Sequence, residues 1–390
     1  MARYDRIAPL PSPSREAAFP AWPALCDLEA DERDAELGRR ARLRFLALRP
    51  VRRLLHVGID RVPADSFDRQ VEGVREELGH LPARDRERSR IARFLHQIRS
   101  RTPLALTTAT LDLGEVLEAA EHYHGASEYY HTALELASAY GLTPEQVVAH
   151  RLLGRVLRKT GRIEEAEREY RTAAGFADQL EDREQWARSL DGLGQTLCGR
   201  KHYEEARRLY REILQRGREF EDPSLISIAL VGLCLTEVDA GDFEQAIEYG
   251  WAAFDQAHVG EQRNAVLRGL GNAFLGAGLY PTAERCHRIV AERSSAAFTR
   301  VQALLDLARV AAHAGRTDLA RERLREAVGI ASHLGFRELL TRADELLTGM
   351  ERDAADDSVA DSMAPSPSEG TLRIAAEIEA LDEALVPASS

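Results

Sequence analysis

The chain has 390 residues, of which 44% are hydrophobic and 30% charged, enough for both a buried core and a solvated surface. Its net charge of −12 argues against a general nucleic-acid binder, which usually carries a basic excess. The first residues lack the apolar run of a signal peptide, and no stretch approaches about eighteen uncharged apolar residues, so we expect no membrane association. The four cysteines have no CxxC spacing, and 50 of the 52 basic residues are Arg. Reduced thiols in the cytoplasm of a GC-rich bacterium are the simplest interpretation.

The first 101 residues divide into two parts. Five prolines within residues 1–30 predict an extended, flexible arm. Residues 31–101 are helical in pattern and basic, because residues 39–101 hold seventeen Arg against eight acidic residues. We expect one helix that Pro50 stops, a second over residues 51–57, a third from about Ser66 and a fourth from about Asp85.

Residues 102–336 contain six copies of a sequence repeat. A Leu followed by a small residue recurs at intervals of 40, 40, 40, 37 and 37 residues. The small residues are Gly114, Gly154, Gly194, Cys234, Gly271 and Ala308. An alanine stands twelve residues after each of them, and four residues later come Tyr130, Tyr170, Tyr210, Gly250, His287 and Leu324. Small side chains let two helices pack closely, and the larger one fills the gap towards the next repeat, so each repeat is predicted to be a pair of helices.

This spacing resembles the tetratricopeptide-repeat family, most clearly in LGQTLCGRKHYEEARRLYREIL and LCLTEVDAGDFEQAIEYGWAAF. The resemblance implies an all-α, right-handed superhelical solenoid whose concave groove is lined by the first helix of each pair. The period of 37 to 40 residues exceeds the family's usual one of about 34, so we expect helices about one turn longer.

The C-terminal residues are predicted to leave the repeat pattern in three steps. Residues 337–350 form a capping helix over the last repeat. Residues 351–370 are acidic and then Ser/Pro-rich, which is typical of a disordered linker. Residues 371–387 form an amphipathic helix with Ile374, Ile378, Leu381 and Leu385 on one face. This helix is either a docking segment or a solvated tail.

No sequence signature of catalysis is present: there is no phosphate loop, HExxH, GxSxG or paired CxxC. His122, His124 and His131 lie near one predicted turn, but no Cys or carboxylate completes a metal-binding set. We therefore expect no enzyme activity, no cofactor and no metal.

The prediction of function rests on the residues that line the predicted groove. Residues on its inner helical face are Arg151, Arg155, Arg158, Arg188, Gln195, Ile228, Val231, Leu235, Arg268, Asn272, Leu305 and Arg309. An apolar fourth repeat flanked by arginines suits a partner segment with apolar anchors and acidic flanks. This predicts a non-enzymatic scaffold or adaptor for a protein or peptide. The chain's own acidic C-terminal helix is a candidate occupant, in this chain or in a neighbouring copy.

Two alternatives stay open. The surface of the groove can be tolerant of any sequence and bind nothing. The chain can also be a peptide-sensing transcriptional or signalling regulator whose basic N-terminal helices contact DNA.

Overall fold

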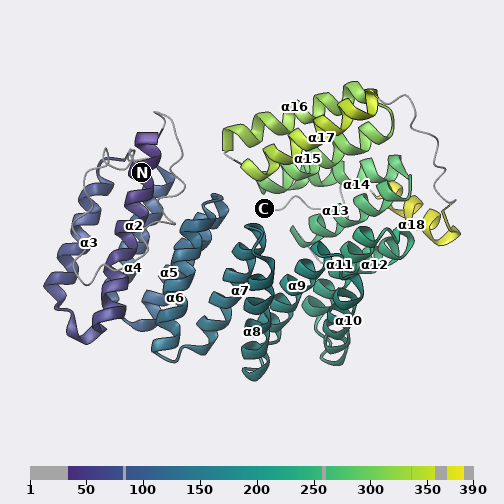
Figure 1. The fold of residues 1–390 in the computed structure, drawn as a ribbon. Helices are drawn as coiled ribbons and strands as arrows, with labels where there is room; N and C mark the ends of the chain where they lie inside the picture. The colour runs from purple at the N-terminus through teal and green to yellow at the C-terminus, as the bar shows by residue number, and fades with distance from the viewer. Residues whose placement is uncertain (1–33, 82–84, 257–260, 335, 356–366, 382–390) are drawn as a thin grey trace. The chain divides into compact units, whose positions relative to one another are not determined.

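The computed structural model describes residues 34–81, 85–256, 261–334, 336–355 and 367–381, and the predicted arm at residues 1–30 lies outside them. Over this part of the chain the fold is all-α (Figure 1). Its helices are α2 (Asp34–Val57), η3 (Ile59–Arg61), α3 (Ala64–Leu78), α4 (Arg86–Gln97), η4 (Ile98–Ser100), α5 (Pro103–Ala119), α6 (Tyr123–Ala139), α7 (Thr143–Lys159), α8 (Ile163–Gln179), α9 (Arg183–Gly199), α10 (Tyr203–Glu219), α11 (Pro223–Ala240), α12 (Phe243–Gln256), α13 (Glu261–Gly276), α14 (Tyr280–Arg293), α15 (Ala297–His313), α16 (Thr317–Leu334), α17 (Arg337–Ala355) and α18 (Glu369–Ala380).

The described residues divide into two compact units, one up to Trp186 and one from Ala187, so that the boundary falls within the sequence of α9. In the first unit, α2, α3 and α4 precede the repeats and pack onto α5 and α6. Phe67 of α3 and Phe94 of α4 are buried in the same core as Tyr129 of α6. In the second unit, a core of Leu and Ala side chains continues from α15 through α16 into α17.

The structure corrects the prediction that Pro50 ends a helix, because α2 runs through it without a break. Pro50 is buried, and its neighbours Val51 and Leu54 are fully buried against the helices that α2 contacts, α3 and α6. A proline inside a helix removes one backbone hydrogen bond. Here the burial of the surrounding apolar side chains offsets that loss.

The predicted repeat becomes six helix pairs, from α5 with α6 to α15 with α16. Helices α5 to α10 span 17 residues each, whereas α14 spans 14, which accounts for the shortening of the period from 40 to 37 in the fifth repeat. The helices are thus longer in the repeats with the 40-residue period, and their excess over the family's usual helices stays a prediction.

The small residue and the aromatic residue meet within one repeat, and in the third repeat the aromatic also reaches the next. A Cβ placed on Gly194 would lie 2.6 Å from the ring of Tyr210, and one on Gly154 would lie 3.0 Å from Tyr170. Tyr210 also contacts Gly232 on α11, so its ring lies between two first helices. The prediction that the aromatic fills the gap towards the next repeat is therefore incomplete, because its first contact is with its own repeat.

The turn inside each repeat contains one residue in the left-handed backbone region. This residue is Gly161, Gly241, Gly278 and Gly315 in four repeats, and Glu121 and Lys201 in the other two. Glycine adopts this conformation without steric cost, so it marks the end of the first helix in the sequence.

Helix α11 is long and apolar enough to cross a membrane, by length and composition alone. Half of that stretch is buried inside the structure, where α11 contacts α10, α12 and α13 as the first helix of the fourth repeat. The same composition is expected for a helix that packs on several sides.

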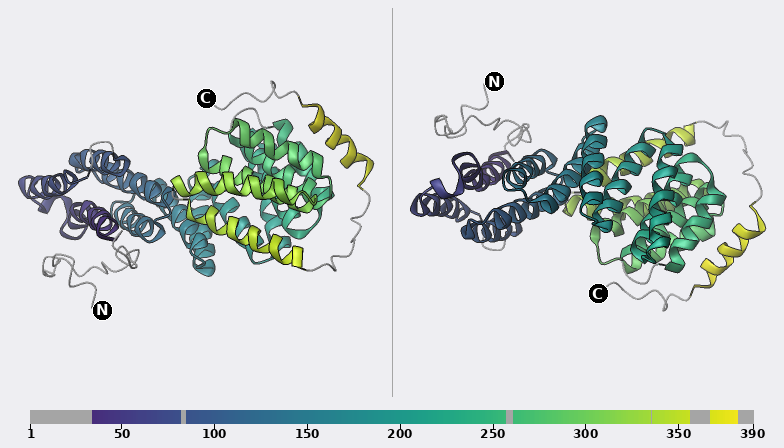
Figure 2. Two further views of the ribbon diagram at one scale, coloured as in Figure 1. Left: turned by 90° about the horizontal axis from the view of Figure 1, so that it is seen from above. Right: turned by 90° about the horizontal axis from the view of Figure 1, so that it is seen from below.

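The C-terminal helices occupy two separate places. α17 packs on α15 and α16, and it continues five residues past the predicted end of the capping helix at residue 350. α18, the helix at the yellow end of the colour scale, packs instead against α12 and α14 (Figures 1 and 2). Ile374 and Ile378 are buried there and Leu381 is half-buried, so these members of the predicted apolar face do pack inward. Leu385 lies outside the described residues.

Candidate functional site

The first helices of neighbouring repeats adjoin one another within each unit. α5 contacts α7 in the first unit, and α11, α13 and α15 contact one another in sequence in the second, where the capping helix α17 in turn contacts α15. The predicted groove residues Ile228, Val231, Arg268, Asn272 and Arg309 are all partly exposed on these helices. Leu305 differs, because it is buried on α15 and is corrected here from a surface residue to a core residue.

Helix α11 presents an apolar stripe, which we define as Ile228, Val231, Leu235 and Val238. Leu235 is the most exposed of the four, at 37%. The opposite side of the helix buries Leu225, Leu230 and Leu233. α11 is thus apolar on both sides, and one of its apolar sides is left partly uncovered by the repeats.

Helix α9, which precedes α11 in the array of first helices, carries polar side chains at the positions where α11 carries the apolar stripe. Gln195 donates a hydrogen bond to Asp191 at 2.9 Å, and the hydroxyl of Tyr210 donates to the same carboxylate at 3.0 Å. Arg188 is exposed on the same helix.

On the other side of α11, the buried residue Asp306 collects the cationic side chains of three helices. Its carboxylate lies 3.1 Å from Arg268 of α13, 3.3 Å from Arg309 of α15 and 3.5 Å from Arg342 of α17. His287 of α14 is 3.9 Å away. We call these five residues the Asp306 cluster. Three guanidinium groups facing one carboxylate leave a local excess of positive charge.

The cluster shifts the pKa values of its two buried members. Burial alone would raise the pKa of Asp306, but His287 and the surrounding arginines hold it below its ordinary value. The pKa of His287 is lowered to about 4, mainly by burial; Asp306 opposes this shift, and the nearby Arg309 and Arg268 add to it. Both groups therefore favour the form in which Asp306 is charged and His287 neutral.

The sequence identified Arg268, Asn272 and Arg309 but missed Asp306, His287 and Arg342 as members of one site. A signal for Asp306 was present: it lies two residues before the small residue of its repeat, where three earlier repeats have Gly192, Gly232 and Gly269. A carboxylate in a column of buried glycines needs a charged partner. Arg342 has no such signal, because it lies on the capping helix outside the repeat.

In the first unit, the predicted arginines also bond to the chain's own acids. The guanidinium of Arg155 lies 2.7 Å from the carboxylate of Glu118, which is 4% exposed and also accepts a hydrogen bond from Tyr130 at 2.9 Å. Burial would raise the pKa of Glu118, but Arg155 and Lys159 hold it below its ordinary value. Arg151 donates to Gln185 at 3.0 Å, and Arg158 is half-buried. These arginines stabilise contacts between repeats as well as facing solvent.

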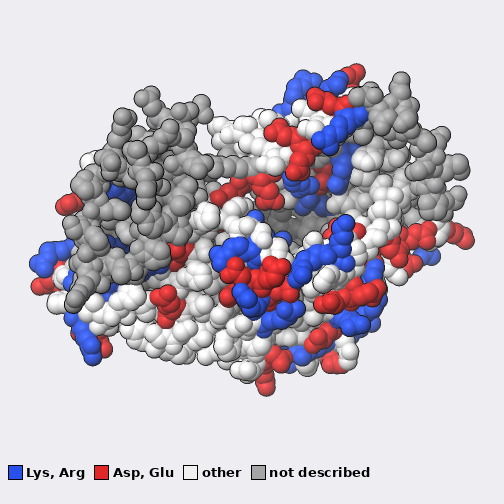
Figure 3. All heavy atoms as spheres, viewed as in Figure 1, with Lys and Arg blue, Asp and Glu red and all other residues white. Residues whose placement is uncertain are grey.

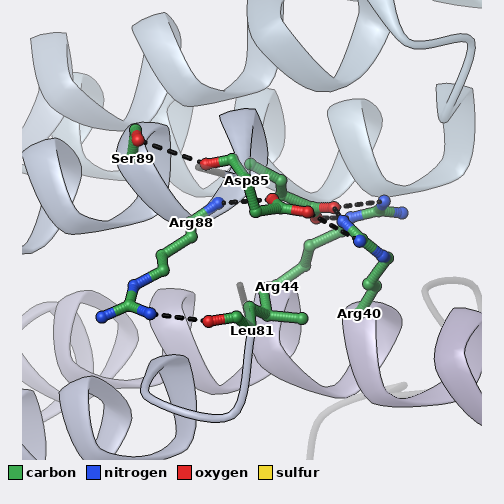
Figure 4. A network of polar contacts seen from close by, with 7 residues as sticks. Arg40, Arg44, Leu81, Asp85, Arg88 and Ser89 are labelled. Atoms are coloured by element: carbon green, nitrogen blue, oxygen red, sulfur yellow. Dashed lines mark hydrogen bonds and ion pairs between the residues drawn. The ribbon is translucent and has the colours of Figure 1, made fainter. Parts of the chain in front are cut away.

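The basic N-terminal region shows the same internal pairing (Figure 4). Arg40 of α2 bonds to Asp85 at 2.7 Å, and Arg44 bonds to Glu87 at 2.5 Å at the start of α4. Arg52 lies 2.6 Å from Glu128 of α6. Figure 3 shows Lys and Arg beside Asp and Glu on the parts of the face in view that grey residues do not cover.

Comparison with known proteins identifies the repeats. A family model described as tetratricopeptide repeat matches residues 105–179 and 148–219, and a second model with the same description matches residues 301–326. No curated protein sequence matches the chain.

Solved structures similar to this chain include a Rap protein complexed with competence and sporulation factor, at 14% identity and a TM-score of 0.47, covering 80% of this chain and 98% of that one. The apo form of the quorum sensor NprR from B. thuringiensis has 12% identity and a TM-score of 0.42, with coverage of 77% and 99%. Pseudomonas aeruginosa pilF has 21% identity and a TM-score of 0.39, with coverage of 60% and 96%.

Proposed function

Because this chain belongs to the tetratricopeptide-repeat family, we propose that it is a non-enzymatic adaptor whose first helices hold a segment of a partner protein or peptide. The observation that carries the proposal is the apolar stripe of α11, whose most exposed member is Leu235. Apolar side chains that remain accessible on a surface lined mostly by polar ones are typical of an interaction site. The adaptor would act in the cytoplasm, where its cysteines stay reduced.

The chemistry around the stripe supports a particular kind of ligand. The Asp306 cluster has more cationic than anionic groups, and Arg268 and Arg309 are partly exposed. A carboxylate of the ligand would bind there with bidentate geometry. We therefore propose that a partner segment places apolar side chains over α11 and an acidic side chain over α13 and α15.

The internal ion pairs make the groove arginines poor probes of partner binding alone. Arg155 is bonded to the buried Glu118, so its replacement would alter stability together with binding. Leu235 is a cleaner probe, because its side chain is exposed and replacement by Asp leaves the core intact. Leu347 on α17 is a matched control with an exposure of 39%.

The experiment compares wild type, Leu235→Asp and Leu347→Asp as bait in lysate of the native host, after circular dichroism has shown equal helicity and equal melting temperatures. We expect a partner that wild type and Leu347→Asp retain and Leu235→Asp loses. A Kd for that partner should rise at least about fivefold with Leu235→Asp, since an apolar anchor in an interface contributes about 1–3 kcal/mol. Equal capture by all three baits would rule out the stripe as the site.

The competing function, a regulator that contacts DNA through its basic N-terminal helices, is not favoured by a specific observation. Arg40, Arg44 and Arg52 are engaged with carboxylates of the same unit, so they do not form a free basic face. Its test is binding of duplex DNA by the full chain across a salt series, in which a phosphate-binding protein loses affinity steeply as salt rises.

A further inference from the structure

Helix α18 lies on the second helices of the repeats, away from the first helices that carry the proposed adaptor site. The sequence hypothesis that this helix fills the groove of first helices is corrected by its contacts with α12 and α14. Thr371, Ile374, Ala375 and Ile378 are the residues of α18 that are buried there. These four residues of α18 form a narrow face of small or β-branched side chains, which fits a shallow groove between two helices.

The two ends of α18 are held through main-chain atoms. Glu244 of α12 accepts a hydrogen bond from the backbone N–H of Ser368, the N-cap residue, at 2.7 Å. Arg285 of α14 donates to the carbonyl oxygen of Ile378 at 3.0 Å and to that of Leu381. An acid thus faces the helix N-terminus and a guanidinium faces the C-terminus, which matches the sign of the helix dipole at both ends.

Side-chain contacts add a preference to this arrangement. The hydroxyl of Thr282 on α14 donates to the carboxylate of Glu379 at 2.7 Å, so the site favours an acid in the last turn of the bound helix. Leu372 on the outer side of α18 is 49% exposed and takes no part in the docking. The site therefore selects the direction and length of the bound helix and its short buried face, but it does not select most of the α18 sequence.

The short length and few buried residues of α18 indicate that another helix can replace it. A helix of twelve residues is marginal in water by itself, and only four of its residues are buried against the repeats. Its attachment to the same chain raises its effective concentration at the site, which compensates for a weak interface. A partner helix of the same pattern that is more stable in water than α18 would compete with it for the site.

We propose that α12 and α14 form a second binding site, a clamp for an amphipathic helix of about three turns, and that α18 occupies it until a partner helix displaces it. The partner helix has small or β-branched residues spaced as in Thr371, Ile374, Ala375 and Ile378, and an acidic residue in its last turn. This mode is a helix laid in a groove. It is distinct from the stripe on α11 and does not depend on it.

The test uses the full chain and a labelled synthetic peptide of residues 367–381, blocked at both ends. The double variant Ile374→Asp/Ile378→Asp releases α18, because it places charges on the two most important buried side chains. Fluorescence anisotropy should show the peptide binding this released variant at least about tenfold more tightly than wild type, in which α18 fills the site. Equal binding to both proteins, or no binding to the released variant up to millimolar concentration, would overturn the proposal.

Variants of the clamp separate this site from a non-specific surface. Within the released variant, Glu244→Gln with Arg285→Gln should weaken peptide binding by at least about tenfold, because both charge-assisted contacts to the helix ends are lost. Arg288→Gln removes a guanidinium group, as Arg285→Gln does, but from an exposed position of α14. It should leave the Kd of the peptide unchanged. If the two sets of changes have equal effects, the clamp does not recognise helix ends.

Two further measurements distinguish the neighbouring explanations. Leu235→Asp should leave peptide binding unaltered, so loss of the adaptor site and loss of the clamp are independent outcomes. Sedimentation equilibrium of wild type and of the released variant should give the same mass. A wild-type dimer that becomes a monomer on release would mean that α18 docks on a second copy, which contradicts occupation within one chain.

Discussion

Asp306 on α15 and Arg268 on α13 are joined by an ion pair of 3.1 Å between two neighbouring first helices, and the carboxylate is 1% exposed. Arg309 and Arg342 share the same carboxylate. Replacing Asp306 with Asn keeps the shape but leaves three guanidinium groups around a neutral side chain. We expect Asp306→Asn to lower the free energy of unfolding by about 3–5 kcal/mol, as for other charge pairs that lose one buried partner. Urea denaturation followed by circular dichroism measures this change.

The control for this variant is Asp344→Asn, which removes the same charge from an exposed position of α17. A surface change of this kind should alter the free energy of unfolding by no more than about 0.5 kcal/mol. Comparable losses for the two variants would mean that net charge, and not the Asp306 cluster, determines the effect.

His287 makes the stability of the second unit depend on pH. Its pKa is about 4 in the folded chain, against an ordinary value of 6.5, so between these values the unfolded chain binds the proton more readily. Stability is therefore fully present above about pH 6.5 and falls as the pH is lowered towards 4. The loss amounts to about 3 kcal/mol, since one pKa unit corresponds to about 1.4 kcal/mol. Below that, protonation of Asp306, whose pKa is also lowered, removes further stability.

The variant His287→Phe tests this origin of the pH dependence. Aromatic rings occupy the same column in Tyr130, Tyr170 and Tyr210, each packed on a glycine, as His287 packs on Gly271. Phe should therefore fit the site, and urea denaturation from pH 7 to pH 4.5 should show a flatter profile than that of wild type. An unchanged slope would assign the pH dependence to other groups.

The sequence predicts the repeats well because the residues that pack them recur at fixed positions in each repeat. A small residue, an alanine and an aromatic recur in register, and the structure brings Gly194 against Tyr210 as that pattern requires. The exposure of Leu235 follows in the same way from its position one residue after the small one. The helix-breaking tendency of proline does not predict the structure at Pro50, because burial of the neighbouring apolar side chains outweighs it.

The pairing of the groove arginines could have been predicted but was not. Arg155 contacts Glu115, which is 40 residues earlier in the same column, and Arg309 contacts Asn272, which is 37 residues earlier. Adjacent repeats place such residues side by side, so opposite charges one period apart indicate an internal ion pair. The position of α18 is different: a solenoid has grooves between its second helices as well as a surface of first helices, and an amphipathic pattern does not choose between them.

Two glycines of the second unit should respond oppositely to replacement by alanine. A Cβ on Gly232 of α11 would overlap the ring of Tyr210, which is buried between helices and cannot move away. Gly329 of α16 is exposed, and an added Cβ meets nothing within 4 Å. We expect Gly329→Ala to stabilise the unit by about 0.5–1 kcal/mol through helix propensity. Gly232→Ala should destabilise it by about 1–3 kcal/mol through overpacking.

Thermal unfolding of both glycine variants checks this contrast. The helix propensity gained is the same in each case, so the difference between the two melting temperatures reports the contact of Gly232 with Tyr210. If Gly232→Ala melts at or above the wild-type temperature, α11 and α10 do not approach as closely as described.

The buried cysteines provide a last prediction about accessibility. Burial raises the pKa of both Cys234 and Cys286 to about 12, and burial also raises that of Cys198. The thiolate is the reactive form, so at pH 8 these thiols should react with Ellman's reagent only as fast as the chain opens. In a Cys26→Ser background, we expect three slow thiols in the native protein and three fast ones in guanidinium. Adding Leu347→Cys should introduce one fast native thiol, because that position is 39% exposed. Rapid native labelling of Cys234 or Cys286 without that addition would mean that the helices around them separate far more often than their packing implies.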